Sequence, residues 1–190
     1  DKNGLGRKLS KFIESRRDLG LWTPAIIGPN SLGIVLSPLK ISTLFISRNR
    51  LPINFHKNGN IGFISQSGAF FITRLSNSPE LPIKFGFCIG NQMDKKASDI
   101  IKTMSEDKDL KIFSVYIEGF ADRDAIKFTE TAKSIIAEGK KVILYKGGRS
   151  DEGMEAAAGH TGAMAANYDL QKNLFKNAGI IVTERFDEFT

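Results

Sequence analysis

A glycine- and alanine-rich stretch, residues 146–165 (KGGRSDEGMEAAAGHTGAMA), carries His160, one of the two histidines in the chain. Its neighbours Gly159, Thr161 and Gly162 are small, so a backbone can approach a ligand closely and the imidazole can stand clear of bulky side chains. A phosphate group would find exposed N–H donors in such a loop. Taken by itself, one histidine among small residues is weak evidence for a site, and a glycine-rich surface connection with an incidental histidine is the alternative.

A second candidate site begins where the apolar run 60–65 ends and a helical pattern starts, at Ser67, Gly68 and Ala69. Ser67 can cap the helix, and Gly68 has no side chain to hold a ligand away from the backbone. The free amides and the dipole of a helix start favour an anion. The alternatives are a plain strand-to-helix turn with a serine cap, and the flavin-phosphate turn of flavodoxin-like proteins.

Glu118 ends another apolar run, in the sequence YIEGF. If its carboxylate faces the loop that carries His160, it could accept the proton on one ring nitrogen. That bond would fix the tautomer and leave the other nitrogen as a nucleophile. A solvated glutamate at the end of a strand is the alternative.

Patterns for other kinds of active site are absent from the sequence. His56 and His160 lie far apart, and Cys88 is the single cysteine, so we expect no metal site. There is neither the G-x-S-x-G of serine hydrolases nor the P-loop pattern G-x-x-x-x-G-K-[ST]. We assign His56 no role and expect Cys88, which lies in an apolar run, to be a small buried hydrophobe.

The elements that must position these residues alternate regularly from residue 60 onward. The pattern predicts five strands, at 60–65, 84–89, 111–117, 141–145 and 180–182, and intervening helices at 67–76, 97–105, 122–138 and 167–178. Nearly continuous apolar strands favour a parallel sheet covered on both faces, here a flavodoxin-like doubly wound α/β domain. Ligands bind outside the carboxyl ends of such strands. The loops 66–69, 90–94, 118–120 and 146–161 should therefore meet at one edge.

The first 59 residues are less regular. They predict an amphipathic helix at 4–19, a short strand at 25–28, a turn at 29–31 and an extended piece at 33–36. This part is too short to build a core of its own, and we interpret it as the end of an α/β domain. An extended linker with one edge strand, at 43–46, should follow.

Charge and composition limit the partners. Residues 1–60 hold ten Lys and Arg against three Asp and Glu, which suits a phosphate-rich cofactor, with a solvated basic face as the alternative. The basic residues are scattered and lack an aromatic RNA-binding motif, so we expect no nucleic-acid partner. No apolar run reaches the roughly 20 residues that cross a bilayer, and no signal peptide is recognisable. The single cysteine fits a reducing, cytoplasmic location.

Taken together, these motifs resemble those of the NDP-forming acyl-CoA synthetases of the succinyl-CoA synthetase superfamily, over almost the whole chain. In chain order they are Gly28-Pro29-Asn30-Ser31-x-Gly33-Ile34, Ser65-Gln66-Ser67-Gly68, Gly90-Asn91, Glu118-Gly119, Lys146-x-Gly148-Arg149-Ser150 and Gly159-His160-Thr161-Gly162. The first segment and the last two are specific at this spacing, whereas the others support the resemblance through their order.

The resemblance implies a division of the chain. Residues 1–45 would be the end of a Rossmann-like CoA-binding domain, 46–59 a linker, 60–184 a flavodoxin-like CoA-ligase domain and 185–190 the start of a following element. Gly28, Pro29, Asn30 and Ser31 would lie near the thioester end of CoA.

The resemblance also implies a reaction. Acyl-CoA and phosphate would give an acyl phosphate, and His160 would take the phosphoryl group and pass it to ADP, with Mg²⁺, on an ATP-grasp domain or subunit outside this chain. Glu118 would hydrogen-bond the histidine. The phosphoryl group would be held by Ser67, Gly68, Ala69, Gly159, Thr161 and Gly162. An oligomer is implied, and a catalytically incomplete acyl-CoA-binding or regulatory module is the alternative.

Overall fold

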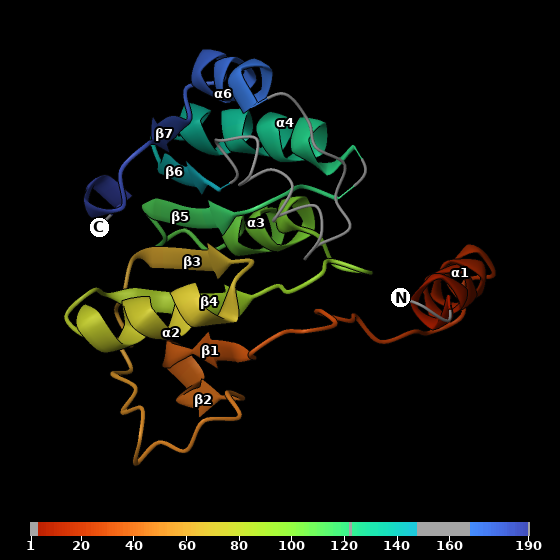
Figure 1. Cartoon of the computed structure of the whole chain (residues 1–190), viewed down its shortest axis with the longest axis horizontal. Helices are drawn as coiled ribbons and strands as arrows, with labels where there is room; N and C mark the ends of the chain where they lie inside the picture. Colours follow the sequence, from red (N-terminus) through yellow and green to blue (C-terminus); the bar gives the residue numbers. More distant parts are fainter. Residues whose placement is uncertain (1–3, 122, 148–167, 190) are drawn as a thin grey trace.

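Five parallel strands form the centre of the structure, a computed structural model that describes residues 4–121, 123–147 and 168–189. They are β3 (Ile61–Ser65), β4 (Ile83–Cys88), β5 (Ile112–Ile117), β6 (Lys141–Lys146) and β7 (Ile181–Thr183). Their order across the sheet is β4-β3-β5-β6-β7, as Figure 1 shows. This is the flavodoxin-like order, so the predicted fold class is confirmed.

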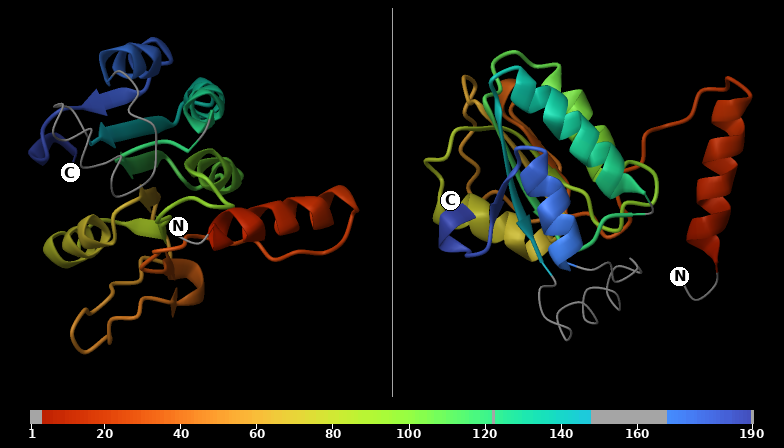
Figure 2. Two further views of the ribbon diagram at one scale, coloured as in Figure 1. Left: turned by 45° about the vertical axis from the view of Figure 1, so that its right-hand side comes forward. Right: turned by 90° about the horizontal axis from the view of Figure 1, so that it is seen from above.

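The four strands β3 to β6 pack side chains into a core on each face of the sheet. On β5, Phe113, Val115 and Ile117 are fully buried against the helices α3 (Ala97–Ser105), α4 (Asp124–Ala137) and α6 (Tyr168–Asn177). On the opposite face, α2 (Gly68–Asn77) and the short helix η2 (Asp187–Phe189) cover a second, phenylalanine-rich core (Figure 2). Burial on both faces explains why the strands have nearly continuous apolar sequences.

Two further strands extend the sheet beyond β4, and they make it a mixed sheet of seven strands rather than five. β1 (Ile34–Leu36) pairs antiparallel with β4, and β2 (Ile41–Ser42) pairs antiparallel with β1. The edge strand predicted at 43–46 is therefore wrong in position, since β2 ends at Ser42. The chain reverses its direction before residue 43, because the short helix η1 (Ser37–Leu39) ends at Lys40 in a left-handed conformation (φ 52°).

The predicted strand at 25–28 is wrong. Residues 25–28 have no strand pairing in the structure, and Gly28 has φ +119°, a conformation that interrupts an extended chain. The segment is instead tied to the loop after β4. Ile26 accepts a hydrogen bond from the amide of Lys95, and Gly28 accepts one from the amide of Met93.

The N-terminal helix α1 (Leu5–Asp18) stands at the side of the sheet, as both views in Figure 2 show. An ion pair links it to the loop after β4. The guanidinium of Arg17 donates to both carboxylate oxygens of Asp94, at 2.5 and 2.8 Å, and Asp94 also accepts from the amide of Ile26. Asp94 therefore holds the helix, the segment after it and the loop that follows β4.

Candidate functional site

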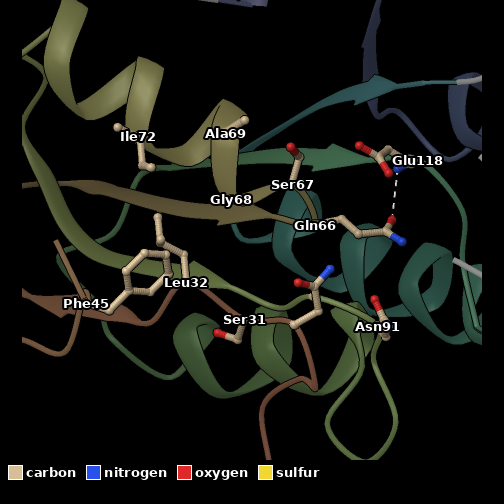
Figure 3. Close-up of a pocket in the computed structure, with 12 residues that line it drawn as sticks. Ser31, Leu32, Phe45, Gln66, Ser67, Gly68, Ala69, Ile72, Asn91 and Glu118 are labelled. Atoms are coloured by element: carbon tan, nitrogen blue, oxygen red, sulfur yellow. Dashed lines mark hydrogen bonds between the residues drawn. The ribbon is translucent and has the colours of Figure 1, made fainter. Parts of the chain in front are cut away.

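The carboxyl ends of β3 and β5 meet at the point where the strand order reverses. β3 leads through α2 to β4 on one side, whereas β5 leads through α4 to β6 on the other. Their loops diverge and leave a crevice, which is where ligands bind in such sheets. A cleft of about 500 Å³ lies there (Figure 3), and it is lined by Asn30, Ser31, Leu32, Phe45, Gln66, Ser67, Gly68, Ala69, Ile72, Gly90, Asn91 and Glu118.

The start of α2 forms one wall of this cleft. The hydroxyl of Ser67 caps the helix and accepts from the amide of Phe70 at 3.3 Å, as predicted. The amides of Gly68 and Ala69 have no acceptor within the described parts of the chain. They lie at the positive end of the helix dipole, so this wall suits an anion such as phosphate.

The segment 28–31 forms the opposite wall with the loop after β4. The carbonyl of Pro29 accepts from the amide of Asn91 at 2.9 Å. Gly90 has φ +55°, and a Cβ there would collide with the carbonyl oxygen of Pro29. Asn30 and Ser31 line the cleft, but the Ser31 hydroxyl is already engaged, because it donates to the Cys88 carbonyl at 2.6 Å. The same hydroxyl accepts from the amide of Gly33 at 3.1 Å, so it is engaged both as donor and as acceptor.

Glu118 also lines the cleft (Figure 3). Its Oε1 accepts from the hydroxyl of Tyr116 at 3.3 Å. Burial, followed by the nearby Glu118 charge, raises the pKa of Tyr116, so the phenol stays protonated and remains a donor. Sequence reasoning missed Tyr116, because a strand tyrosine is indistinguishable from a core aromatic.

One side of the cleft is apolar. Leu32, Phe45 and Ile72 line it, and the Phe45 ring is largely exposed, at 80%. None of the three was predicted, since the chain reaches them from three separate segments. The cleft thus places an apolar surface opposite polar groups, the arrangement of a site that binds a small organic ligand.

The predicted His160, Gly159, Thr161 and Gly162 lie outside the described residues. The chain that leads to them leaves from beside Glu118. The amide of Gly147 donates to the Ile117 carbonyl at 2.7 Å, and a methyl group added at Gly147 would lie 3.5 Å from Glu118 Cα and Cγ. Three of the four predicted loops therefore meet at the cleft, and the fourth begins there.

The other singled-out residues lie elsewhere or have structural roles. His56 is not among the residues that line the cleft, and its Nε2 lies 3.0 Å from the Pro79 carbonyl. Cys88 is fully buried as predicted, and burial raises the pKa of its thiol, so the reactive thiolate is disfavoured. Within residues 4–121, 123–147 and 168–189, no helix is long and apolar enough to span a membrane, and no three His, Cys, Asp or Glu side chains are grouped to bind a metal ion.

Comparison with known proteins agrees with this fold. The subunit alpha of acetate–CoA ligase [ADP-forming] II from Pyrococcus furiosus is 33% identical over 96% of this chain and 37% of the relative. The acetate–CoA ligase [ADP-forming] from Methanocaldococcus jannaschii is 36% identical over 86% of this chain and 22% of the relative. The chain thus spans less than two fifths of either relative.

Among solved structures, the dinucleotide-forming acetyl-coenzyme A synthetase 1 of Ca. Korarchaeum cryptofilum, in complex with phosphate and ADP, superposes with a TM-score of 0.79 and 26% identity. The match covers 95% of this chain and 38% of that one. Residues 58–190, which include the strands and loops on the α2 and Glu118 sides of the cleft, match the family model of the succinyl-CoA ligase-like flavodoxin domain, and the chain belongs to that family.

Proposed function

We propose that this chain is part of an NDP-forming acyl-CoA synthetase, an acid–thiol ligase, and that it carries the phosphoryl group between acyl-CoA and nucleotide on His160. The relatives at 33% and 36% identity are ADP-forming acetate–CoA ligases, which supports this activity. One observation carries the proposal. The anion-binding start of α2 and the Glu118 carboxylate share one cleft, and the loop that bears His160 leaves from beside Glu118.

The proposed reaction has three steps. An oxygen of phosphate attacks the thioester carbon, the C–S bond breaks, and CoA leaves as the thiol with an acyl phosphate as the other product. A ring nitrogen of His160 then attacks phosphorus, and the bond from phosphorus to the carboxyl oxygen breaks and releases the acid. In the last step the terminal phosphate oxygen of ADP takes the phosphoryl group from His160.

The described residues suit these steps through position and charge. Phosphoryl transfer needs alignment and neutralisation of negative charge, which the amides of Gly68 and Ala69 provide at the start of α2. The carboxylate of Glu118 would accept the N–H of the non-reacting ring nitrogen, so that the other nitrogen keeps its lone pair. The backbone of Asn30 and Ser31 would hold the thioester end of acyl-CoA, and ADP with Mg²⁺ would bind an ATP-grasp domain outside this chain.

We also propose the domain division predicted from the sequence, with boundaries at 45/46, 59/60 and 184/185. β1 and β2 fall in the first part and yet extend the sheet of the ligase part. The CoA-binding and ligase parts would therefore share one sheet. Assembly with an ATP-grasp subunit would make the protein an oligomer, and the single cysteine supports a cytoplasmic location.

Radiolabelling tests the proposed function. The complete enzyme, with its ATP-grasp domain or subunit, is incubated with labelled phosphate and acetyl-CoA. We expect acid-labile, alkali-stable label on the protein, lost in His160→Asn and retained in the control His56→Asn. Label that survives in His160→Asn would refute the assignment. Acetyl-CoA binding without any label would favour the acyl-CoA-binding module instead.

A further inference from the structure

Three buried polar side chains converge on the peptide groups just after β5. Gln66 comes from the end of β3, Gln92 from the loop after β4, and Lys146 is the last residue of β6. Their exposed fractions are only 5%, 4% and 7%. Burial of amide and ammonium groups is costly unless they are hydrogen-bonded, so their partners show what they do.

Their partners are the backbone groups of Glu118 and Gly119. Gln66 Oε1 accepts from the amide of Glu118 at 2.9 Å and from that of Gly119 at 3.0 Å. Lys146 Nζ donates to the carbonyl of Glu118 at 2.9 Å, and Gln92 Nε2 donates to the carbonyl of Gly119 at 3.0 Å. Both amides and both carbonyls of this dipeptide are thus bound by side chains.

This arrangement compensates for the end of the strand. The pairing of β5 with β6 stops at Ile117, so Glu118 and Gly119 have no sheet ladder to fix them. A free dipeptide at a strand end could rotate and take the carboxylate with it. The ends of β3 and β6 and the loop after β4 hold it instead, and Gln92 extends the connection because its Oε1 accepts from the amide of Ala97 at the start of α3.

The carboxylate itself stays available. Lys146 Nζ bonds to the carbonyls of Glu118 and Gly147 rather than to the Glu118 side chain. Burial lowers the pKa of Lys146, whereas the charge of Glu118 raises it. Within the described parts of the chain, Tyr116 is the single hydrogen-bond donor to the Glu118 carboxylate.

We propose that Gln66, Gln92 and Lys146 are positioning residues of the phosphoryl-transfer site, which fix the Glu118–Gly119 peptide groups and thereby direct the Glu118 carboxylate into the cleft. This assignment rests on the proposed function. A misplacement of about 1 Å in a group that orients a reactant can cost roughly 10²-fold in rate, so the three side chains would act on the rate of transfer rather than on acyl-CoA binding.

The first test is the variant Lys146→Met, which keeps the aliphatic stem and removes the donors. In the complete enzyme we expect the kcat for phosphorylation from phosphate and acetyl-CoA to fall about 10- to 100-fold, with the KM for acetyl-CoA changed less than about twofold. Lys140→Met is the matched control. Lys140 Nζ also donates to a carbonyl, that of Ser105 at 2.9 Å, but before β6 begins, at the other end of the sheet.

A double-mutant cycle separates positioning from a merely structural role. If Lys146 acts through the Glu118 carboxylate, adding Lys146→Met to the Glu118→Ala variant should lower the kcat for phosphorylation by less than a further factor of about two. Additive losses would overturn the assignment. Should Lys146→Met fail to fold, Gln92→Met replaces it in the same cycle, with the same two outcomes.

Amide hydrogen exchange tests the geometry without any activity. Gln66→Met removes the shared acceptor, so the amides of Glu118 and Gly119 should exchange at least tenfold faster, while the paired amides of residues 113–116 keep their rates. Unchanged exchange at 118 and 119 would overturn the assignment. If the wild-type enzyme takes up no label at all, the proposed function fails, and the positioning role of the three side chains fails with it. If Lys146→Met takes up label at the wild-type rate, only the positioning role fails.

Discussion

At the scale of single residues, the Glu118 carboxylate is the group on which the proposed chemistry depends most. We expect Glu118→Ala to slow phosphorylation of His160 by roughly 10²- to 10⁴-fold, the usual range for loss of an acid–base element. The measurement is the single-turnover rate of label uptake from phosphate and acetyl-CoA. A rate equal to that of the wild-type enzyme would exclude Glu118 from the mechanism.

Tyr116 should contribute less than Glu118 to the rate of phosphorylation, and only through its hydrogen bond to the Glu118 carboxylate. Its hydroxyl donates to Glu118 Oε1 over a long 3.3 Å, and such a bond contributes about 1 kcal/mol. Tyr116→Phe should therefore slow the same single-turnover rate about fivefold and have no effect in the Glu118→Ala background. A loss in that background would mean that Tyr116 acts on something else.

Gly90 allows a prediction about stability. Both Gly90 (φ +55°) and Gly139 (φ +81°) have left-handed backbones, but a Cβ at Gly139 meets open space, whereas one at Gly90 meets the backbone of Pro29 and Asn30. Gly139→Ala should lower the free energy of unfolding by about 1 kcal/mol. Gly90→Ala should lower the free energy of unfolding by at least about 2 kcal/mol more than Gly139→Ala does, as measured by urea denaturation. Equal losses of unfolding free energy in the two variants would show that the segment 28–31 shifts to accommodate the added methyl group.

Residue chemistry was only partly predictable from the sequence. Ser67, Gly68 and Glu118 were found because they follow apolar runs, and parallel topology brings such positions together. The roles of Gln92 and Lys146 could not be predicted, because they depend on the burial of both side chains in the folded protein. A glutamine in a loop and a lysine at a strand end are normally solvated, and only the folded chain shows that they bind a peptide backbone.

At the scale of elements, length and regularity decided what the sequence could predict. The parallel strands β3 to β6 are five or six residues long and strongly apolar, so they were found within one or two residues. β1 and β2 have three and two residues. The extended piece predicted at 33–36 contains β1, but the antiparallel pairing of β1 with β4 and of β2 with β1 is a contact that no local pattern encodes. The segment 25–28 resembled a strand, but Gly28 turns it toward the loop after β4.

Attachment of helix α1 should depend on pH. The hydrogen bond from Arg17 lowers the pKa of Asp94, although burial opposes this shift. A carboxylate with a lowered folded pKa stabilises the folded arrangement above its unfolded pKa of about 3.9, and this contribution is lost as pH falls through the folded pKa. We therefore expect α1 to stay attached at neutral pH and to detach in acid, below about pH 4.

The single tryptophan, Trp22, reports on this step, since it lies in the segment between α1 and the sheet. Its fluorescence anisotropy should fall as α1 detaches. Arg17→Met should give the low value already at neutral pH. The matched control is Arg16→Met, since Arg16 lies over the ring of Phe12 on the helix itself. An anisotropy that is independent of pH and of Arg17 would contradict the role of this ion pair.

At the scale of the whole molecule, the uneven charge bears on how a CoA thioester reaches the cleft. The net charge is +6, and residues 1–60 hold ten of the 27 Lys and Arg but only three of the 21 Asp and Glu. That part includes α1, the wall of the cleft at Asn30 and Ser31, and β1 and β2. A basic surface next to a binding cleft raises the local concentration of an anionic ligand, and salt screens the effect.

Salt should therefore weaken binding of acetyl-CoA, which carries several phosphate charges. Between about 50 and 500 mM NaCl the Debye length falls from roughly 14 to 4 Å, so we expect the apparent Kd to rise at least about threefold. Acetyl-pantetheine has the same thioester end without phosphates, and its binding should change less than twofold. Calorimetric titration of both ligands makes the comparison. If both respond equally, salt acts on the cleft itself; if neither responds, the basic N-terminal part is a solvated face without a role in binding.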